Sequence, residues 1–159
     1  MSTRLPVIDP VIEQYVIEAL TAFEREAFFA TAVMLGAASE KELYLLAKAV
    51  LLALKDAKRQ SKLQALLDRR KLLELFEAVR DTIHEAAKAK LLPYADYEGS
   101  DTHLMSLFEA IRVQRNDAVH PMNATVSEES VRILIQSFPY ALAKSETLRS
   151  WLIANPGSI

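Results

Sequence analysis

Apolar residues recur every three or four positions along most of this chain, which is the spacing of amphipathic helices. The pattern predicts a first helix over 9–36, beginning at Asp9-Pro10, because aspartate is a favoured N-cap and proline is tolerated at the first helical position. A second helix is predicted to open at residues 39–42, which have the form of a capping box. Residues 60–90 are again helical in pattern, as one helix or as two that break near Asp68.

Turn signals divide the second half of the chain. Proline and glycine frame a predicted loop over 92–100 that is rich in aromatic and acidic residues. Ser127 is the predicted cap of a later helix, which Pro139 kinks or ends. A short last helix is predicted around 148–153, stopping at the Asn-Pro-Gly sequence that follows.

The composition agrees with a helical protein. Only three residues are glycine, while 51% are apolar and 25% are charged, which is ordinary for a globular chain. A length of 159 residues is most simply one domain with a core of its own. The fold class predicted is therefore all-α, an antiparallel bundle of five to six helices in a single domain over 1–159.

The chain contains no cysteine, which excludes disulfides, thiolate metal sites and cysteine nucleophiles and fits a reducing cytoplasm. Residues 1–14 hold one basic residue and no apolar core, so a signal peptide is not expected. The longest uncharged run, over 27–39, is shorter than the roughly 20 residues that span a bilayer. We expect a soluble, cytoplasmic protein without a membrane partner.

Charge is unevenly distributed along the chain. The formal net charge of −2 argues against a protein that coats nucleic acid in general. Between Lys55 and Lys71, however, seven basic residues stand against only Asp56 and Asp68. This local excess either attracts a polyanion or is a solvated helix face with its connection to the next helix.

One predicted helix carries an arginine where its pattern expects an apolar side chain. The helix begins at Ser100 or Asp101 and ends near Val119, and Arg115 continues its apolar stripe of Leu104, Leu107, Phe108 and Ile111. A guanidinium is costly to bury unless it is paired and hydrogen-bonded, so Arg115 belongs either to an ion pair or to a functional site. The candidate ion-pair partners are Asp117, Glu109 and two glutamates of the first helix, Glu24 and Glu26.

A histidine follows five residues after this arginine. On an unbroken helix Arg115 and His120 would lie about 140° apart and would not serve one site. Pro121 disfavours the α conformation of the residue before it, so His120 lies at or beyond the helix end and its imidazole can turn back toward Arg115. The sequence thus predicts a shared Arg–His site, or else a helix-terminal histidine that only forms hydrogen bonds.

These residues resemble the signature of the HEPN superfamily (higher eukaryotes and prokaryotes nucleotide-binding domains). That signature is an arginine followed by a polar residue, a short spacer and a histidine near a helix end. Arg115 with Asn116 beside it, four residues before His120, and Pro121 behind match it. The resemblance is sharp over about seven residues, and the helical bundle predicted for the rest of the chain is compatible with the family's architecture.

The resemblance implies a helical homodimer in which two copies of the motif face one cleft. Many members are metal-independent endoribonucleases, so it implies cleavage of single-stranded RNA with 2′,3′-cyclic phosphate ends and no cofactor. Proton transfer by His120 from two protomers and phosphate binding by Arg115 fit that chemistry. Asn116 would orient the histidine or bind a phosphate oxygen.

Other members of this superfamily suggest alternatives. Some bind a nucleotide, RNA or a protein partner without catalysis, and a helical dimer with no polynucleotide ligand is a third reading. Toxins of the superfamily that pair with a nucleotidyltransferase antitoxin carry a modified tyrosine two positions after the histidine. That position is Met122 here, which argues against this form of control, although a toxin or defence role with a protein antitoxin or regulatory partner stays open.

A metal centre is a weaker interpretation. Asp81 with His84, and Asp117 with His120, repeat the Asp-x-x-His spacing, and two carboxylate-x-x-His units help to form di-iron sites in helical bundles. Such sites use glutamate, and Pro121 removes one of the histidines from regular helix. We therefore expect no metal.

Overall fold

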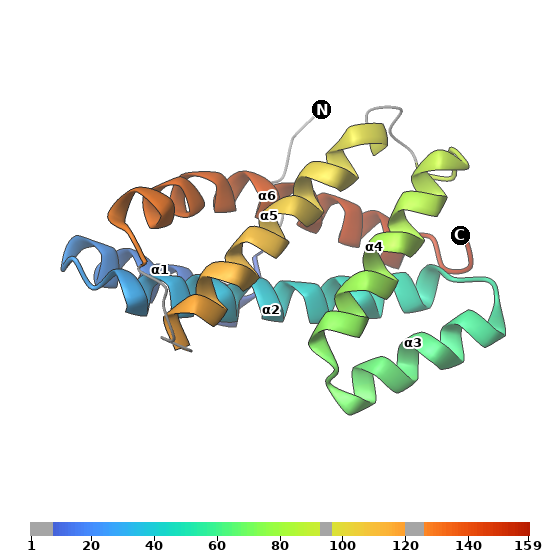
Figure 1. Cartoon of the computed structure of the whole chain (residues 1–159). Helices are drawn as coiled ribbons and strands as arrows, with labels where there is room; N and C mark the ends of the chain where they lie inside the picture. The colour runs from blue at the N-terminus through green and yellow to red at the C-terminus, as the bar shows by residue number, and fades with distance from the viewer. Residues whose placement is uncertain (1–7, 93–96, 120–125) are drawn as a thin grey trace. The chain divides into compact units, whose positions relative to one another are not determined.

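The computed structural model describes residues 8–92, 97–119 and 126–159, with the side chains of 97–105 left out. Within these ranges the chain forms helices and no strand, so the predicted all-α class is confirmed (Figure 1). The helices are α1 (Pro10–Glu24), α2 (Phe28–Ala53), α3 (Ala57–Arg69), α4 (Leu72–Lys88), α5 (Tyr97–Val119) and α6 (Glu128–Ala154). None of the helices described combines the length and the apolar composition that a bilayer span requires.

Contacts along the chain group it into two compact units. The first comprises Met1–Glu42 and Ser106–Lys144, and the second comprises Leu43–Met105 and Ser145–Ile159. Parts of α2, α5 and α6 belong to each unit, while α1 lies in the first and the pair α3 and α4 lies in the second. The predicted Arg115 position falls in the first unit, and the basic segment falls in the second.

Helix α1 begins where the sequence predicts but ends earlier. The Asp9 carboxylate accepts hydrogen bonds from the backbone N–H groups of Val11 (2.9 Å) and Ile12 (3.4 Å), and Pro10 occupies the first helical position. The predicted helix over 9–36 is wrong beyond Glu24, because Glu26 takes the left-handed conformation with φ of 59°. No glycine marks this turn, so it carries no local signal that a sequence pattern could detect.

The predicted capping box at 39–42 is also wrong. Helix α2 continues through it, with Ser39 6% exposed and the Glu42 side chain fully buried. A capping serine has to sit at a helix start, whereas the residues before Ser39 are helix formers that extend back to Phe28. The capping-box pattern depends only on nearby residues, whereas the burial of this stretch stabilises a continuous helix.

The open question over 60–90 is answered by two helices. Asp56 caps α3, accepting from the N–H groups of Lys58 (2.8 Å) and Arg59 (2.9 Å). Arg70 ends it in the left-handed conformation with φ of 52°, and α4 starts at Leu72. Helices α3 and α4 contact each other across this short turn (Figure 1).

The Asp56 cap makes a pH-dependent contribution to stability. Hydrogen bonds from the backbone of Arg59 and Lys58 hold the pKa of this carboxyl below its ordinary value of 3.8. Its contribution is therefore present above that value and is lost as the pH falls through the lowered pKa. Asp56→Asn keeps a capping oxygen but does not titrate. We expect the advantage in Tm of the wild type over this variant to shrink below about pH 4. A difference in Tm that stays constant down to about pH 2 would contradict this.

Helices α5 and α6 are longer than predicted. Helix α5 already includes Tyr97, so the predicted loop over 92–100 is wrong for its last residues. Ser127 caps α6 as predicted, because its Oγ accepts from the N–H of Ser130 at 3.1 Å. Pro139 does not end α6, which continues to Ala154 in place of a separate last helix. Residues on both sides of the proline are buried, including Phe138, Ala141 and Leu142, and this packing holds the helix together.

Candidate functional site

Arg115 lies on the buried stripe of α5 that the sequence indicates. Phe108 is 3% exposed and Ile111 is fully buried, whereas the Arg115 side chain keeps 35% of its surface exposed. The arginine therefore begins within the packed interface of the helix, and its charged end reaches toward solvent.

The stem of Arg115 packs directly on the backbone of α2 at Gly36. A Cβ atom added to Gly36 would lie 2.4 Å from Cγ and 2.7 Å from Cβ of Arg115, closer than real atoms approach. Gly36 is itself buried inside a regular helix, where glycine is a poor helix former. The glycine at this position is explained by the close approach of Arg115.

Among the described residues, the guanidinium has two polar neighbours. Its Nη2 lies 3.6 Å from Oε1 of Glu40, and its Nη1 donates a hydrogen bond to Oδ1 of Asn116 at 3.4 Å. Glu40 follows Gly36 by four residues and so lies on the same face of α2, about one turn on. Together, Gly36 receives the hydrocarbon stem and Glu40 receives the charged head.

The partner of Arg115 differs from every candidate that the sequence suggested. Glu109 pairs with Arg112 in its own helix at 2.5 Å, and the structure places neither Asp117, Glu24 nor Glu26 in an ion pair with Arg115. The sequence pattern does not indicate Glu40 as the partner, because it predicts a helix start at residues 39–42. The usable signal was the isolated glycine in an alanine- and leucine-rich helix, with a carboxylate one turn later.

Apolar packing fixes the last turns of α5. Ala118 packs against a buried cluster of Ala32, Val126 and Val131, which also contacts Phe23, Phe28 and Ile135. Outside the cluster, Gln114 accepts a hydrogen bond from the Ser130 hydroxyl of α6 at 3.3 Å. Arg115 and Asn116 are consequently carried by a well-packed part of the first unit.

His120, Pro121 and Met122 lie outside the described residues, so the Arg–His pairing stays a prediction. The structure brings together Arg115, Asn116 and Glu40 and says nothing of the histidine. Comparisons with protein-family models, with curated proteins and with solved structures find no match to this chain. The function has therefore to be inferred from the residues of this chain and their arrangement.

Three of the residues weighed for a metal, Asp81, His84 and Asp117, lie in the described part of the chain. Asp81 pairs with Arg80 at 2.9 Å, and His84 is exposed on α4. No group of three or more histidine and acidic side chains comes together there in a way that would hold a metal ion.

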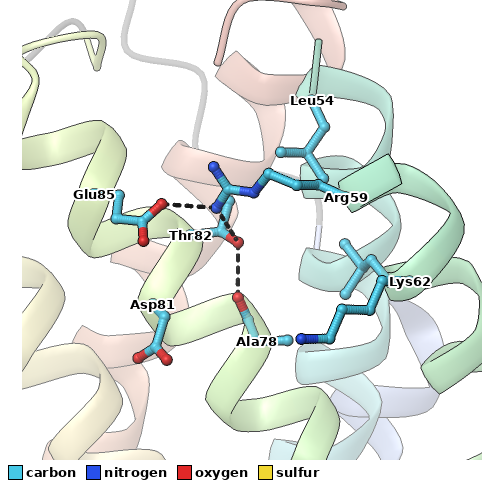
Figure 2. Close-up of a pocket in the computed structure, with 8 residues that line it drawn as sticks. Leu54, Arg59, Lys62, Ala78, Asp81, Thr82 and Glu85 are labelled. Carbon is cyan, nitrogen blue, oxygen red and sulfur yellow. Dashed lines mark hydrogen bonds and ion pairs between the residues drawn. The ribbon is translucent and has the colours of Figure 1, made fainter. Parts of the chain in front are cut away.

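A separate pocket of about 410 Å³ lies between α3 and α4 in the second unit (Figure 2). It is lined by Leu54, Arg59, Lys62, Leu63, Ala78, Asp81, Thr82 and Glu85. Arg59 donates to Glu85 at 2.8 Å and to Thr82 at 3.3 Å, which joins the two helices. Two cations and two carboxylates line this pocket, and both carboxylates form ion pairs, Glu85 with Arg59 and Asp81 with Arg80.

Proposed function

We propose that this protein is a metal-independent endoribonuclease in which Arg115 and His120 of two protomers form a composite site. The observation that carries the proposal is the way Arg115 is held. Its stem is packed on Gly36, its head contacts Glu40 and Asn116, and a third of its side chain stays open to solvent. The guanidinium is thus fixed in position by its stem and still accessible to a ligand.

The donor set of this arginine suits a phosphate. A guanidinium has five N–H donors in a planar fork, and the contacts with Glu40 and Asn116 leave donors available. That fork matches the oxygens of a phosphodiester in two parallel hydrogen bonds. Arg115 would thus neutralise the additional charge that develops on the phosphorane.

The proposed reaction is an internal transfer. One His120 accepts the proton of a ribose 2′-hydroxyl, whose oxygen attacks the adjacent phosphorus and forms the 2′,3′-cyclic phosphate. The bond from phosphorus to the 5′-oxygen breaks, and the His120 of the second protomer gives that oxygen a proton. Asn116 orients the histidine or binds a phosphate oxygen, and neither a metal nor a cofactor is required.

A homodimer is part of the same proposal. Val119, four residues after Arg115 and so on the same side of α5, is 39% exposed at the end of this helix. Exposed apolar residues beside a site favour a partner surface. Single-stranded RNA is the proposed substrate, in a cytoplasmic toxin or defence role that a protein partner controls.

The test is incubation of single-stranded RNA with the protein in EDTA, followed by analysis of the product ends. We expect cleavage that EDTA does not reduce, with 2′,3′-cyclic phosphate on the upstream fragment. RNA that is bound but never cleaved would instead support a non-catalytic module of the same kind.

A further inference from the structure

Helix α3 and the turn after it carry a surplus of positive charge that the structure leaves largely uncompensated. Seven basic residues stand against two acidic ones between Lys55 and Lys71, in a chain whose net charge is −2. Both acidic side chains serve the helix itself. Asp56 caps its first turn, and Asp68 accepts a hydrogen bond from Gln64 at 2.8 Å.

Only two of the basic side chains form ion pairs within the described residues. Arg59 pairs with Glu85 at 2.8 Å, and Lys71 pairs with Glu74 at 2.7 Å. Within the same described ranges, no ion pair is formed by four exposed cations, Lys58, Lys62, Arg69 and Arg70.

Three of these cations form a row, which we call the basic stripe: Lys58, Lys62 and Arg69. On a helix of 3.6 residues per turn they lie within about 40° of one another and extend over roughly 16 Å. Leu63 and Leu67, on the other side of the helix, are buried and half-buried, and α3 contacts α4. The apolar side of α3 is thus used for packing, and the basic stripe is left to solvent.

Two carboxylates that share a pocket with the stripe residue Lys62 already form ion pairs with other cations. Lys62 lines the pocket between α3 and α4, where Asp81 and Glu85 also lie (Figure 2). Asp81 pairs with Arg80 and Glu85 pairs with Arg59. These acidic groups therefore do not cancel the charge of the stripe.

We propose that the basic stripe binds the phosphate backbone of single-stranded RNA, an assignment that rests on RNA as the substrate proposed above. A row of separate cations fits repeated negative charges along a chain better than one compact anion. Insertion into a membrane surface needs an apolar face beside the basic one, and in α3 that face packs inside the protein.

The test measures binding apart from cleavage. Fluorescence anisotropy with a labelled 2′-O-methyl RNA, which has no free 2′-hydroxyl, compares the wild type with Lys58→Gln/Lys62→Gln/Arg69→Gln. Loss of three phosphate contacts should weaken binding about 10- to 100-fold and reduce the slope of log affinity against log salt by about 2. The matched control Arg25→Gln/Lys48→Gln/Lys88→Gln removes three exposed cations elsewhere and should bind like the wild type. Thermal melting of both variants should match the wild type, since the changed side chains are exposed.

Each other outcome has a definite meaning. Three results would refute the proposal that the basic stripe binds RNA. They are no binding by the wild type, unchanged binding by the stripe variant, and an equal loss of binding in the control variant. Competition by polyglutamate as strong as by RNA would also overturn the assignment to RNA. If the wild type binds RNA through the stripe but does not cleave ordinary RNA, only the proposed endoribonuclease activity is refuted. If the wild type cleaves RNA and the stripe variant binds it fully, only the role of the stripe is refuted.

Discussion

Replacing His120 by alanine is expected to lower the rate of RNA cleavage by about 10²- to 10⁴-fold, the range of general acid–base catalysis. The proposed reaction uses this side chain twice, as base in one protomer and as acid in the other. The measurement is the initial rate on single-stranded RNA in EDTA at equal protein concentrations.

The matched control is His84→Ala, which removes an exposed histidine of α4 in the other unit. That variant should keep the wild-type rate within about twofold, as a surface change away from the site. A His120→Ala variant that cleaves like His84→Ala would show that this histidine has no part in the reaction.

The second large effect is expected from Gly36→Ala. Alanine is favoured over glycine in a helix by about 1 kcal/mol, which by itself would stabilise α2. The new methyl group would lie 2.4 Å from Cγ of Arg115, and overpacking of this kind costs typically about 1–3 kcal/mol. Because the close atoms belong to the inner end of the side chain, we expect the clash to win. The net fall in the free energy of unfolding should be about 1 kcal/mol, which corresponds to about 2–4 °C in Tm.

The Gly36→Ala substitution should also displace Arg115 and thereby reduce the rate of RNA cleavage. Gly157→Ala is the control, since that glycine has φ of 65° and open space around it, and alanine there is strained without touching Arg115. It should lower stability by about 1–2 kcal/mol and leave the cleavage rate of the folded protein unchanged. In the double variant Gly36→Ala/Arg115→Ala part of the clash is removed. The loss of stability in the double variant should therefore be smaller than the sum of the losses in the two single variants. Full additivity would mean that Gly36 and Arg115 are not in contact.

Local signals predicted much of the fold. The caps at Asp9 and Ser127 and the stripe of α5 depend on residues close in sequence, and the structure has them. The turns at Glu26 and Arg70 were missed or left open, because both use the left-handed conformation without the glycine that normally marks it. The continuation of α6 through Pro139 depends on packing from outside the helix, which a local pattern does not contain.

The candidate site was predictable to the same extent. An arginine in an apolar slot was visible in the sequence, because it breaks a regular pattern. Its partner was not, since Glu40 belongs to another helix some 75 residues away in the chain and its role depends on tertiary packing. Gly36 is visible in the sequence as an isolated glycine, but its role depends on the packing of α5 against α2, which the sequence pattern does not contain.

The most direct test of the account compares Arg115→Gln with Glu40→Gln in the cleavage assay. Both substitutions break the same partly exposed ion pair, which contributes about 0–1 kcal/mol to stability, so a structural role alone predicts equal and small effects. If Arg115 stabilises the phosphorane, Arg115→Gln should cleave about 10²- to 10³-fold more slowly, while Glu40→Gln stays within about tenfold of the wild type. Equal rates in the two variants would contradict the account.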